Sequence, residues 1–220
     1  MSESSVDTEP AVQLQQLDAC AAATLFASRV LSDSPDGVLL AQLSTPGVLA
    51  EWPLESLQDR VGQAELAASF ASRESLQVIY LDHQRLFLGP ERVLACPYES
   101  VYLNPEHLTF GSQTLAVREW YHRYGLSAPA EGREPDDHIG LELGFVSFLI
   151  MRALEAAELG DDDLLREQCD AVGLFVGEHL LLWAEECLDH VATHAQTHFY
   201  QGVGLLTRGI LHALERTFDP

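Results

Sequence analysis

The densest cluster of groups that could bind or react stands directly before the most apolar stretch of the sequence. In order, the cluster reads Glu134, Pro135, Asp136, Asp137 and His138, and the residues that follow, 139–151, are almost all apolar. An aspartate at such a turn can accept hydrogen bonds from the first free amides of a helix and is favoured by the helix dipole. His138 and Glu142 are four residues apart and would share one face of that helix. Because a helix cap does not need this second polar pair, the segment is also a candidate functional site.

Three histidines repeat at four-residue intervals further along the chain, at His190, His194 and His198, with Glu186 one turn earlier. Two imidazoles at this spacing on a helix can share a zinc ion. All three cannot, because His190 and His198 would lie about 12 Å apart along the helix axis. The stripe also borders apolar positions, where histidine is a tolerated boundary residue. We therefore expect no metal, and only His190 and His194 could form a pair of ligands.

Sequence signatures of common enzymes are absent. The chain has no phosphate-binding loop of the form GxxxxGK[ST], no GxGxxG motif, no HExxH motif and no GxSxG motif. We therefore expect a protein that is not an enzyme and that carries no cofactor.

The charge of the chain restricts its partners. The 220 residues include 34 acidic side chains but only 12 basic ones, all of them arginine, for a formal net charge of −22. Such a surface repels phosphate backbones and anionic lipids, so we expect no nucleic acid and no membrane insertion. It favours a basic partner. The alternative is that the acidic surface serves solubility alone, or reflects a salt-rich cytoplasm.

The sequence also indicates a reducing compartment. Its four cysteines are far apart and form no CxxC pair: Cys20, Cys96, Cys169 and Cys187. The first residues are acidic and polar, and no basic residue precedes Arg29, which is the reverse of a secretory signal. Charge-free stretches remain well below the roughly 18 residues that span a bilayer. We therefore expect reduced core thiols and a cytoplasmic location.

Apolar residues recur at helical spacing along most of the chain, which predicts an all-α bundle of about ten helices. Ser72 is a candidate N-cap for the second part of the predicted segment 54–88, and the acidic run at 161–163 should begin a helix. Residues 89–111 contain three prolines and are expected to form a long loop. The predicted helical segments are 11–32, 36–44, 54–88, 112–124, 138–159, 163–181, 183–198 and 199–217.

Three blocks of the sequence resemble the TorD/DmsD family of chaperones for molybdenum-cofactor oxidoreductases. The segment EPDDHIGLELGFVSFL, beginning at Glu134, is similar to the family's E-P-x-D-H signature. Residues 85–90 (RLFLGP) and 97–102 (PYESVY) resemble a second family segment. A weaker third block comprises Phe175, His179, Leu180, Trp183, Phe199 and Tyr200. The blocks occur in the family's order, from about residue 76 to 206.

The resemblance implies two helical subdomains, 1–124 and 138–220, joined by a hinge at 125–137. Members form monomers or domain-swapped homodimers. Their usual ligand is the twin-arginine leader of a molybdopterin oxidoreductase subunit, with or without its apo form, and binding delays export until the client is folded and loaded with cofactor. The family's functional residues fall here on Pro135, Asp137 and His138, whereas Asp136 occupies a variable position.

A twin-arginine leader presents two guanidinium groups and then an apolar stretch. Asp137 together with Glu134 or Glu142 could bind a guanidinium through paired, charge-assisted hydrogen bonds. Four aromatic side chains are candidates for the neighbouring apolar surface, although packing in the core is the alternative for each of them: Tyr98, Tyr102, Phe87 and Trp120.

Two other functions remain open from the sequence. One is an assembly factor of the nitrate-reductase type that binds only the mature apoenzyme and no leader. The other is a metal-binding helical bundle that uses His190 and His194.

Overall fold

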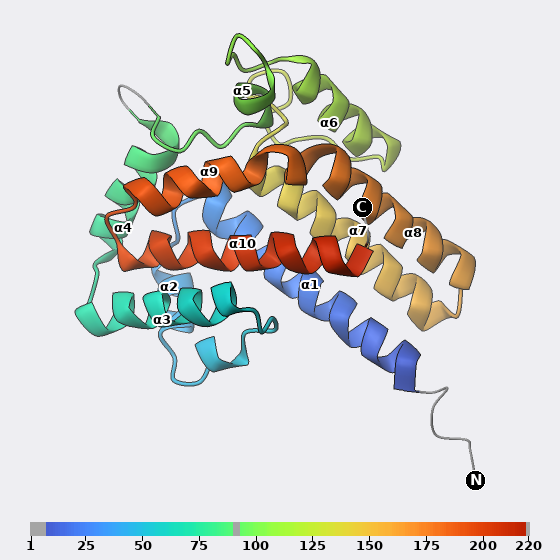
Figure 1. Cartoon of the computed structure of the whole chain (residues 1–220), viewed down its shortest axis with the longest axis horizontal. Coiled ribbons are helices and arrows are strands. Elements are labelled where there is room, and N and C mark those ends of the chain that lie inside the picture. The colour runs from blue at the N-terminus through green and yellow to red at the C-terminus, as the bar shows by residue number, and fades with distance from the viewer. Residues whose placement is uncertain (1–7, 90–92, 219–220) are drawn as a thin grey trace.

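The expected all-helical architecture is confirmed by a computed structural model, which describes residues 8–89 and 93–218 (Figure 1). The polar start at 1–7 and Pro90 of the second matched block lie outside the described residues. Within those residues the chain forms ten α-helices and isolated bridges but no strand. The bounds are α1 Thr8–Ser32, α2 Gly37–Leu43, α3 Leu57–Ser72, α4 Leu76–His83, α5 Glu99–Leu103, α6 Ser112–Arg123, α7 Ile139–Leu159, α8 Asp162–Phe175, α9 Leu181–His194 and α10 His198–Phe218.

Short polar side chains begin several of these helices. Ser56 starts α3 in a capping box with Asp59, and Asp161 accepts from the amide of Leu164 at the start of α8, as its acidic run predicted. The predicted cap at Ser72 is wrong. Ser72 belongs to the last turn of α3, and Ser75 accepts from Val78 to begin α4, because the chain turns through a left-handed residue, Arg73.

Two predicted boundaries also differ from the structure. The expected loop at 89–111 contains a short helix, α5, whose first residues follow Pro97. The predicted helix 183–198 ends at His194, and His198 opens α10 instead. The three histidines therefore do not lie on one helical stripe, because the chain leaves the helix at Ala195.

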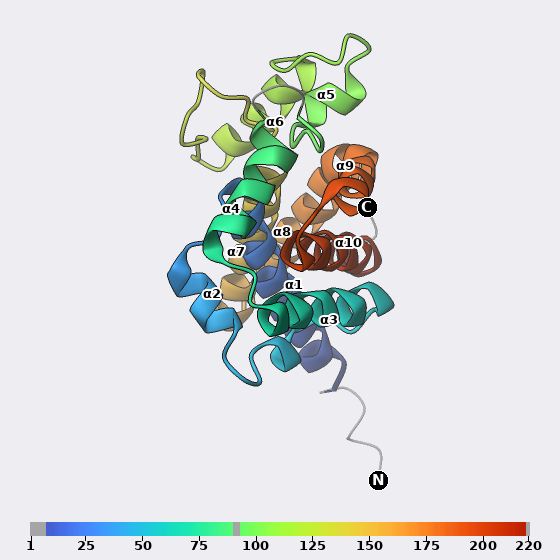
Figure 2. The ribbon, with the colours of Figure 1, turned by 90° about the vertical axis from the view of Figure 1, so that its left-hand side faces the viewer.

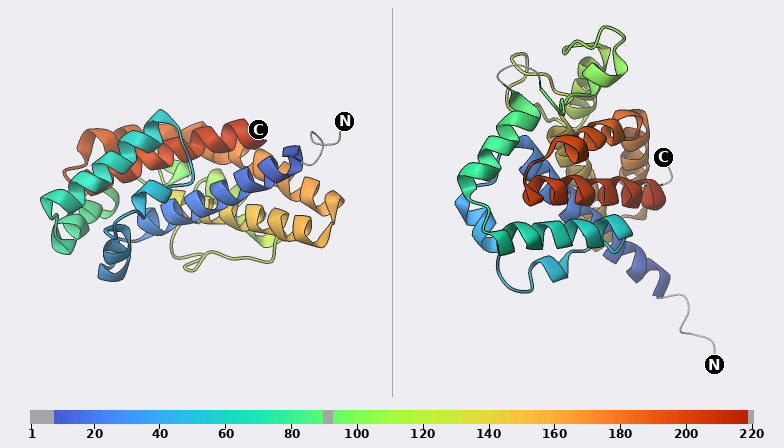
Figure 3. Two further views of the ribbon diagram at one scale, coloured as in Figure 1. Left: turned by 90° about the horizontal axis from the view of Figure 1, so that it is seen from below. Right: turned by 60° about the vertical axis from the view of Figure 1, so that its left-hand side comes forward.

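Helix α7 lies in the middle of the bundle, as its nearly all-round apolar sequence predicted. It packs along α1, and glycines allow the close approach: a Cβ on Gly140 would lie 3.0 Å from the Ser28 carbonyl oxygen. Figures 1 and 3 show α1 beside α7, and α3 beside α10. One apolar core includes residues from both sides of the expected hinge, such as Leu17 and Val146. The division into two subdomains remains a prediction.

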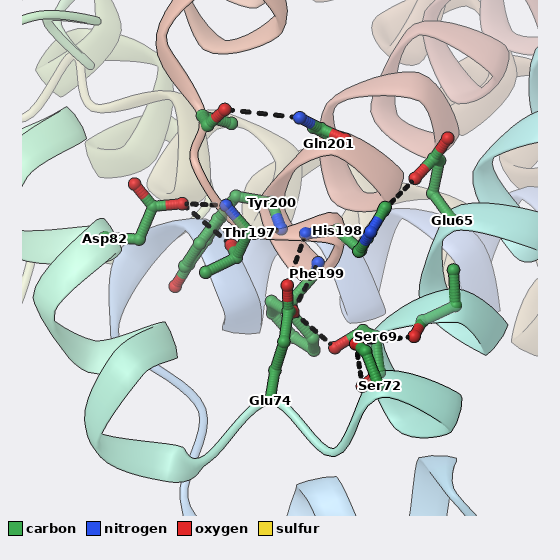
Figure 4. A network of polar contacts seen from close by, with 12 residues as sticks. Glu65, Ser69, Ser72, Glu74, Asp82, Thr197, His198, Phe199, Tyr200 and Gln201 are labelled. Carbon is green, nitrogen blue, oxygen red and sulfur yellow. Dashed lines mark hydrogen bonds and ion pairs between the residues drawn. The ribbon is translucent and has the colours of Figure 1, made fainter.

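The start of α10 is held by carboxylates from the α3–α4 region (Figure 4). Glu74 accepts hydrogen bonds from the backbone amides of His198 and Phe199, and Asp82 accepts from the amide and hydroxyl of Thr197. Carboxylates are favoured at a helix N-terminus, so these contacts explain why α10 begins at His198.

Helices α5 and α6 lie together at one end of the bundle, next to the connection that leads into α7 (Figure 2). In the part of the chain that the structure describes, no helix combines the length and the apolar character needed to cross a membrane.

Candidate functional site

The acidic turn at 134–138 is fixed to the segment around α5, so the first two matched blocks meet in space. Tyr98 and His138 form an antiparallel bridge. The Glu99 amide donates to the Asp137 carbonyl at 3.0 Å, and the Ile139 amide donates to the Pro97 carbonyl at 2.8 Å. The turn thus enters α7 in a fixed position.

Both aspartates of this turn point into the protein. Asp137 has no exposed surface; its carboxylate accepts from the Ser100 amide at 2.7 Å and from the Thr114 hydroxyl at 2.6 Å. Asp136 is equally buried and pairs with Arg118 at 2.7 Å. In this conformation, then, the carboxylate of Asp137 has no exposed oxygen for the guanidinium contact expected from the sequence. Its geometry is that of a positioning residue.

Glu142 is also enclosed. It has no exposed surface, and neither carboxyl oxygen has a hydrogen-bond partner within the described ranges 8–89 and 93–218. Burial, followed by the nearby carboxylates of Glu99 and Asp137, raises the pKa of Glu142 well above its usual value. The raised pKa favours the neutral acid form of Glu142, and its enclosed carboxyl group is not placed to contact a ligand.

The surface beside the turn is hollowed by two adjoining cavities, which we call together the acidic groove. The hinge cavity, of about 230 Å³, is lined by Glu134, Pro135 and His138 among others. The outer cavity, of about 850 Å³, lies between the α1–α2 connection and α4. Asp33, Leu88 and Glu134 line both cavities, so the two form one continuous depression.

The charged groups along this groove are carboxylates. Asp33 and Glu134 are exposed, and neither pairs with a basic side chain in the described residues. Asp36 caps α2 through the Leu39 amide and pairs with Arg29. No arginine is among the described residues that line either cavity.

One wall of the groove is apolar. Leu76, Tyr80 and Leu88 line the outer cavity, and between 44% and 52% of each side chain is exposed. They lie on the same face, because Leu76 and Tyr80 are one turn apart and the helix continues through the π-helical turn Gln84–Leu88. Exposed apolar side chains next to carboxylates suit a ligand that is both cationic and apolar.

Two histidines beside the groove are neutral at pH 7. Burial lowers the pKa of His138 to about 4, and its Nδ1 accepts from the Gly140 amide at 3.0 Å. Burial also lowers the pKa of His83, whose ring lies between Phe87 and Tyr200. Neither imidazole therefore offsets the negative charge of Asp33 and Glu134.

The four candidate aromatic residues are divided between groove and core. Tyr98 lines the hinge cavity, with its ring 5.3 Å from that of His138. Phe87 and Trp120 are buried in the core, and Tyr102 packs on Trp183 at 5.3 Å. Phe87, Trp120 and Tyr102 therefore pack in or against the core, which was the alternative for each of them.

The histidine pair is not part of a larger cluster of candidate metal ligands in the described residues. The His190 and His194 rings are 6.4 Å apart. Among residues 8–89 and 93–218 there is no group of three or more His, Cys, Asp and Glu side chains that could hold a metal ion.

Sequence reasoning missed the far side of the groove. Asp33 and Asp36 lie in a connection with proline between them, and Leu76 and Tyr80 lie in a segment with helical periodicity. The sequence pattern that could have indicated Asp33 is a pair of acidic residues on either side of a proline, directly after a long predicted helix. The periodicity placed Leu76 and Tyr80 on a helix but gave no indication that they remain exposed.

Comparison with known proteins identifies the family. A family model described as nitrate reductase delta subunit matches residues 54–189. The Tat proofreading chaperone DmsD of Salmonella typhimurium is 36% identical over 161 residues, which cover 72% of this chain and 69% of that protein. The chaperone protein TorD of Aliivibrio fischeri is 32% identical over 161 residues, covering 72% and 73%. The chain belongs to the TorD/DmsD family.

Membership in the TorD/DmsD family confirms the resemblance and the expected chaperone function. The names of these relatives describe chaperones. The family model covers α4 and the acidic turn but not Asp33, which contributes the opposite edge of the groove.

Proposed function

We propose that this chaperone binds the twin-arginine leader of a molybdopterin oxidoreductase subunit in the acidic groove. It assists insertion of the cofactor into the apo form of that subunit and delays export of the subunit from the cytoplasm. The observation that carries the proposal is the groove itself, where the Asp33 and Glu134 carboxylates lie beside an apolar wall and no arginine is among the described residues of the lining. Relatives named Tat proofreading chaperone add support.

Glu134 and Asp33 are the carboxylates that bind the guanidinium groups. Each can accept two parallel hydrogen bonds from an arginine, which an ammonium group cannot donate in the same geometry. Asp137 acts through the backbone, since its contacts with Ser100 and Thr114 hold the turn that presents Glu134 and His138. Leu76, Tyr80 and Leu88 supply apolar contact area next to the cationic end.

This assignment is tested by titrating two synthetic peptides, one with adjacent arginines and one with lysines in their place, against the wild-type protein and two variants. Glu134→Gln and Asp33→Asn should each weaken binding of the arginine peptide by about fivefold, the effect of one partly exposed ion pair. The preference for arginine over lysine should shrink in both variants. Glu158→Gln, an exposed acid at the far end of α7, is the matched control and should change nothing.

Equal affinities of the two peptides for all four proteins would exclude the acidic groove as a guanidinium site. A large loss in Glu158→Gln as well would show that only the overall charge matters.

The second candidate function is that of an assembly factor that binds only the mature apoenzyme and not the leader. One observation favours it: Leu108, Phe110 and Leu115, each more than half exposed, lie close together in sequence on the α5–α6 side, outside the lining of the groove. Co-purification of a client with and without its leader separates the two functions, because only the proposed leader chaperone loses its client on truncation.

A further inference from the structure

A basic pocket lies away from the acidic groove and has no assigned ligand. It has a volume of about 380 Å³ and lies where the end of α6, the later part of α7 and the middle of α8 meet. Its lining contains two arginines, Arg123 and Arg152, together with Tyr124, Glu167 and Gln168. Figure 1 shows α8 and α4, which forms the apolar wall of the groove, on opposite sides of the bundle.

The guanidinium of Arg152 is held by packing and by an amide, not by an acid. Its central carbon lies 5.9 Å from the ring centre of Tyr124 and 5.8 Å from that of Phe148. Its Nε donates to the side-chain oxygen of Gln168 at 3.2 Å, and Gln168 is only 1% exposed. Neither terminal nitrogen of Arg152 has a hydrogen-bond or ion-pair partner in the described residues. These nitrogens are therefore donors that a ligand can use.

Arg123 lines the same pocket from α6. Its guanidinium lies 4.8 Å from the ring centre of Trp120, and its Nη2 is 3.8 Å from the carboxylate of Glu119. Both members of that ion pair are more than half exposed, so the pair contributes little and a ligand can replace it. Glu167, the acid in the described lining, forms no ion pair with either arginine.

The charges of the pocket favour a carboxylate over a more highly charged anion. Two guanidinium groups and one carboxylate give the described lining a net charge of +1. A carboxylate has a single negative charge, and its two oxygens can accept paired hydrogen bonds from an arginine. A dianionic phosphate would leave excess negative charge on a chain whose formal charge is already −22.

We infer that the basic pocket binds a carboxylate side chain from an acidic segment in the mature part of the oxidoreductase subunit. The inference rests on the proposed function, because partly exposed arginines bind a free acid only weakly. A subunit that is already held by its leader presents the segment at an effective concentration in the millimolar range, so weak binding becomes sufficient.

The distance between the two sites determines the length of chain that must join them. Arg152 is 14 residues beyond His138 along α7, which is about 21 Å along the helix axis. A flexible chain of about 20 residues has a root-mean-square length of about 25 Å and can connect the groove to the pocket. At an effective concentration of about 2 mM, a pocket with a Kd of about 1 mM would strengthen binding about threefold.

The test uses three synthetic peptides. One contains the adjacent arginines alone. The other two add a linker of about 20 glycine and serine residues and then a short segment, which is rich in glutamate in one peptide and has glutamine at the same positions in the other. Each peptide is titrated at low salt against the wild-type protein, Arg123→Gln, Arg152→Gln and the control Arg60→Gln. Arg60 is an exposed arginine of α3 outside the described lining of the pocket, and its replacement changes the net charge equally.

The wild-type protein and Arg60→Gln should bind the glutamate peptide about threefold more tightly than the glutamine peptide. Repulsion by the net charge of −22 predicts the opposite order, so the sign of the difference is decisive. Arg123→Gln and Arg152→Gln should lose the preference for glutamate and still bind the peptide with arginines alone. Arg123 is exposed, so Arg123→Gln should keep its fold, which circular dichroism verifies, and it tests the pocket even where Arg152→Gln unfolds.

If the wild-type protein binds the glutamine peptide at least as tightly as the glutamate peptide, while the arginines alone still bind, the basic pocket is not a carboxylate site and the proposed function stands. An equal loss of the glutamate preference in Arg60→Gln would assign that preference to overall charge and overturn the inference. If no peptide binds the wild-type protein, both the proposed function and this inference are wrong.

Discussion

At the residue scale, the acidic turn shows how one short motif divides its side chains between structure and binding. The carboxylate of Asp136 pairs with Arg118, and that of Asp137 accepts hydrogen bonds from Ser100 and Thr114. Glu134, in contrast, remains exposed at the groove. Burying a carboxylate is tolerated only with such partners. The buried aspartates therefore fix the backbone, and the exposed glutamate is left to meet a ligand.

Glu142 is the exception, because it is buried without a partner in the described residues. Four titratable groups face it, each from a different neighbouring segment: Glu99 of α5, Asp137 of the turn, Tyr121 of α6 and Cys187 of α9. The carboxylates disfavour ionisation of Glu142, and burial disfavours it most, so its pKa in the folded protein is raised above the usual 4.5.

This raised pKa predicts how Glu142→Gln changes the pH dependence of stability. From about pH 4.5 upward the unfolded chain loses the Glu142 proton while the folded protein keeps it, so the free energy of unfolding falls as pH rises. Glutamine cannot ionise and removes this slope. Urea denaturation between pH 4 and 8 should show the variant to be more stable than wild type near neutrality, with the difference vanishing below about pH 4.5. Parallel pH curves would contradict the assignment.

At the element scale, the position of the groove depends on how closely α1 approaches α7. Gly140 lies in the first turn of α7, where a Cβ would be 2.9 Å from the Ser32 amide nitrogen and 3.0 Å from the Ser28 carbonyl. Ser32 and Asp33, at the end of α1, line the hinge cavity. Contact between these helices thus sets the distance between the two acidic edges of the groove.

Gly140→Ala should consequently separate the two helices. Backbone atoms cannot move aside as a flexible side chain can, so we expect a loss of about 2 kcal/mol in the free energy of unfolding, in the range of overpacked core substitutions. Affinity for the arginine peptide should fall as well, because Asp33 moves relative to Glu134. Gly37→Ala is the matched control: a Cβ there has no neighbour within 4 Å in the described chain, and alanine favours the start of α2. Equal stability of the two variants, measured by denaturation, would contradict this account.

The sequence predicted the elements better than their contacts. Apolar periodicity located α1, α6, α7 and α10 to within a few residues, because each buries a continuous face. It missed α5, a five-residue helix whose backbone position depends on the distant Asp137. In the same way, the motif identified the turn at 134–138 but not which carboxylates would be buried, since Arg118, Ser100 and Thr114 lie elsewhere in the sequence.

At the scale of the whole molecule, a net charge of −22 acts on a ligand before any contact is made. Summed surface charge steers a cationic peptide inward and raises its association rate, and salt weakens this effect beyond about 8 Å at physiological ionic strength. The acidic groove acts only at short range. The summed surface charge and the acidic groove should therefore respond differently to salt.

Stopped-flow kinetics with the arginine and lysine peptides separates these two contributions. Between about 20 mM and 0.5 M salt, the association rate should fall by about tenfold for both peptides, because steering depends on the charge of the whole molecule. Glu134→Gln removes a single charge of the chain and should alter the dissociation rate more than the association rate. An association rate that does not change with salt would mean that the acidic surface takes no part in capturing the leader.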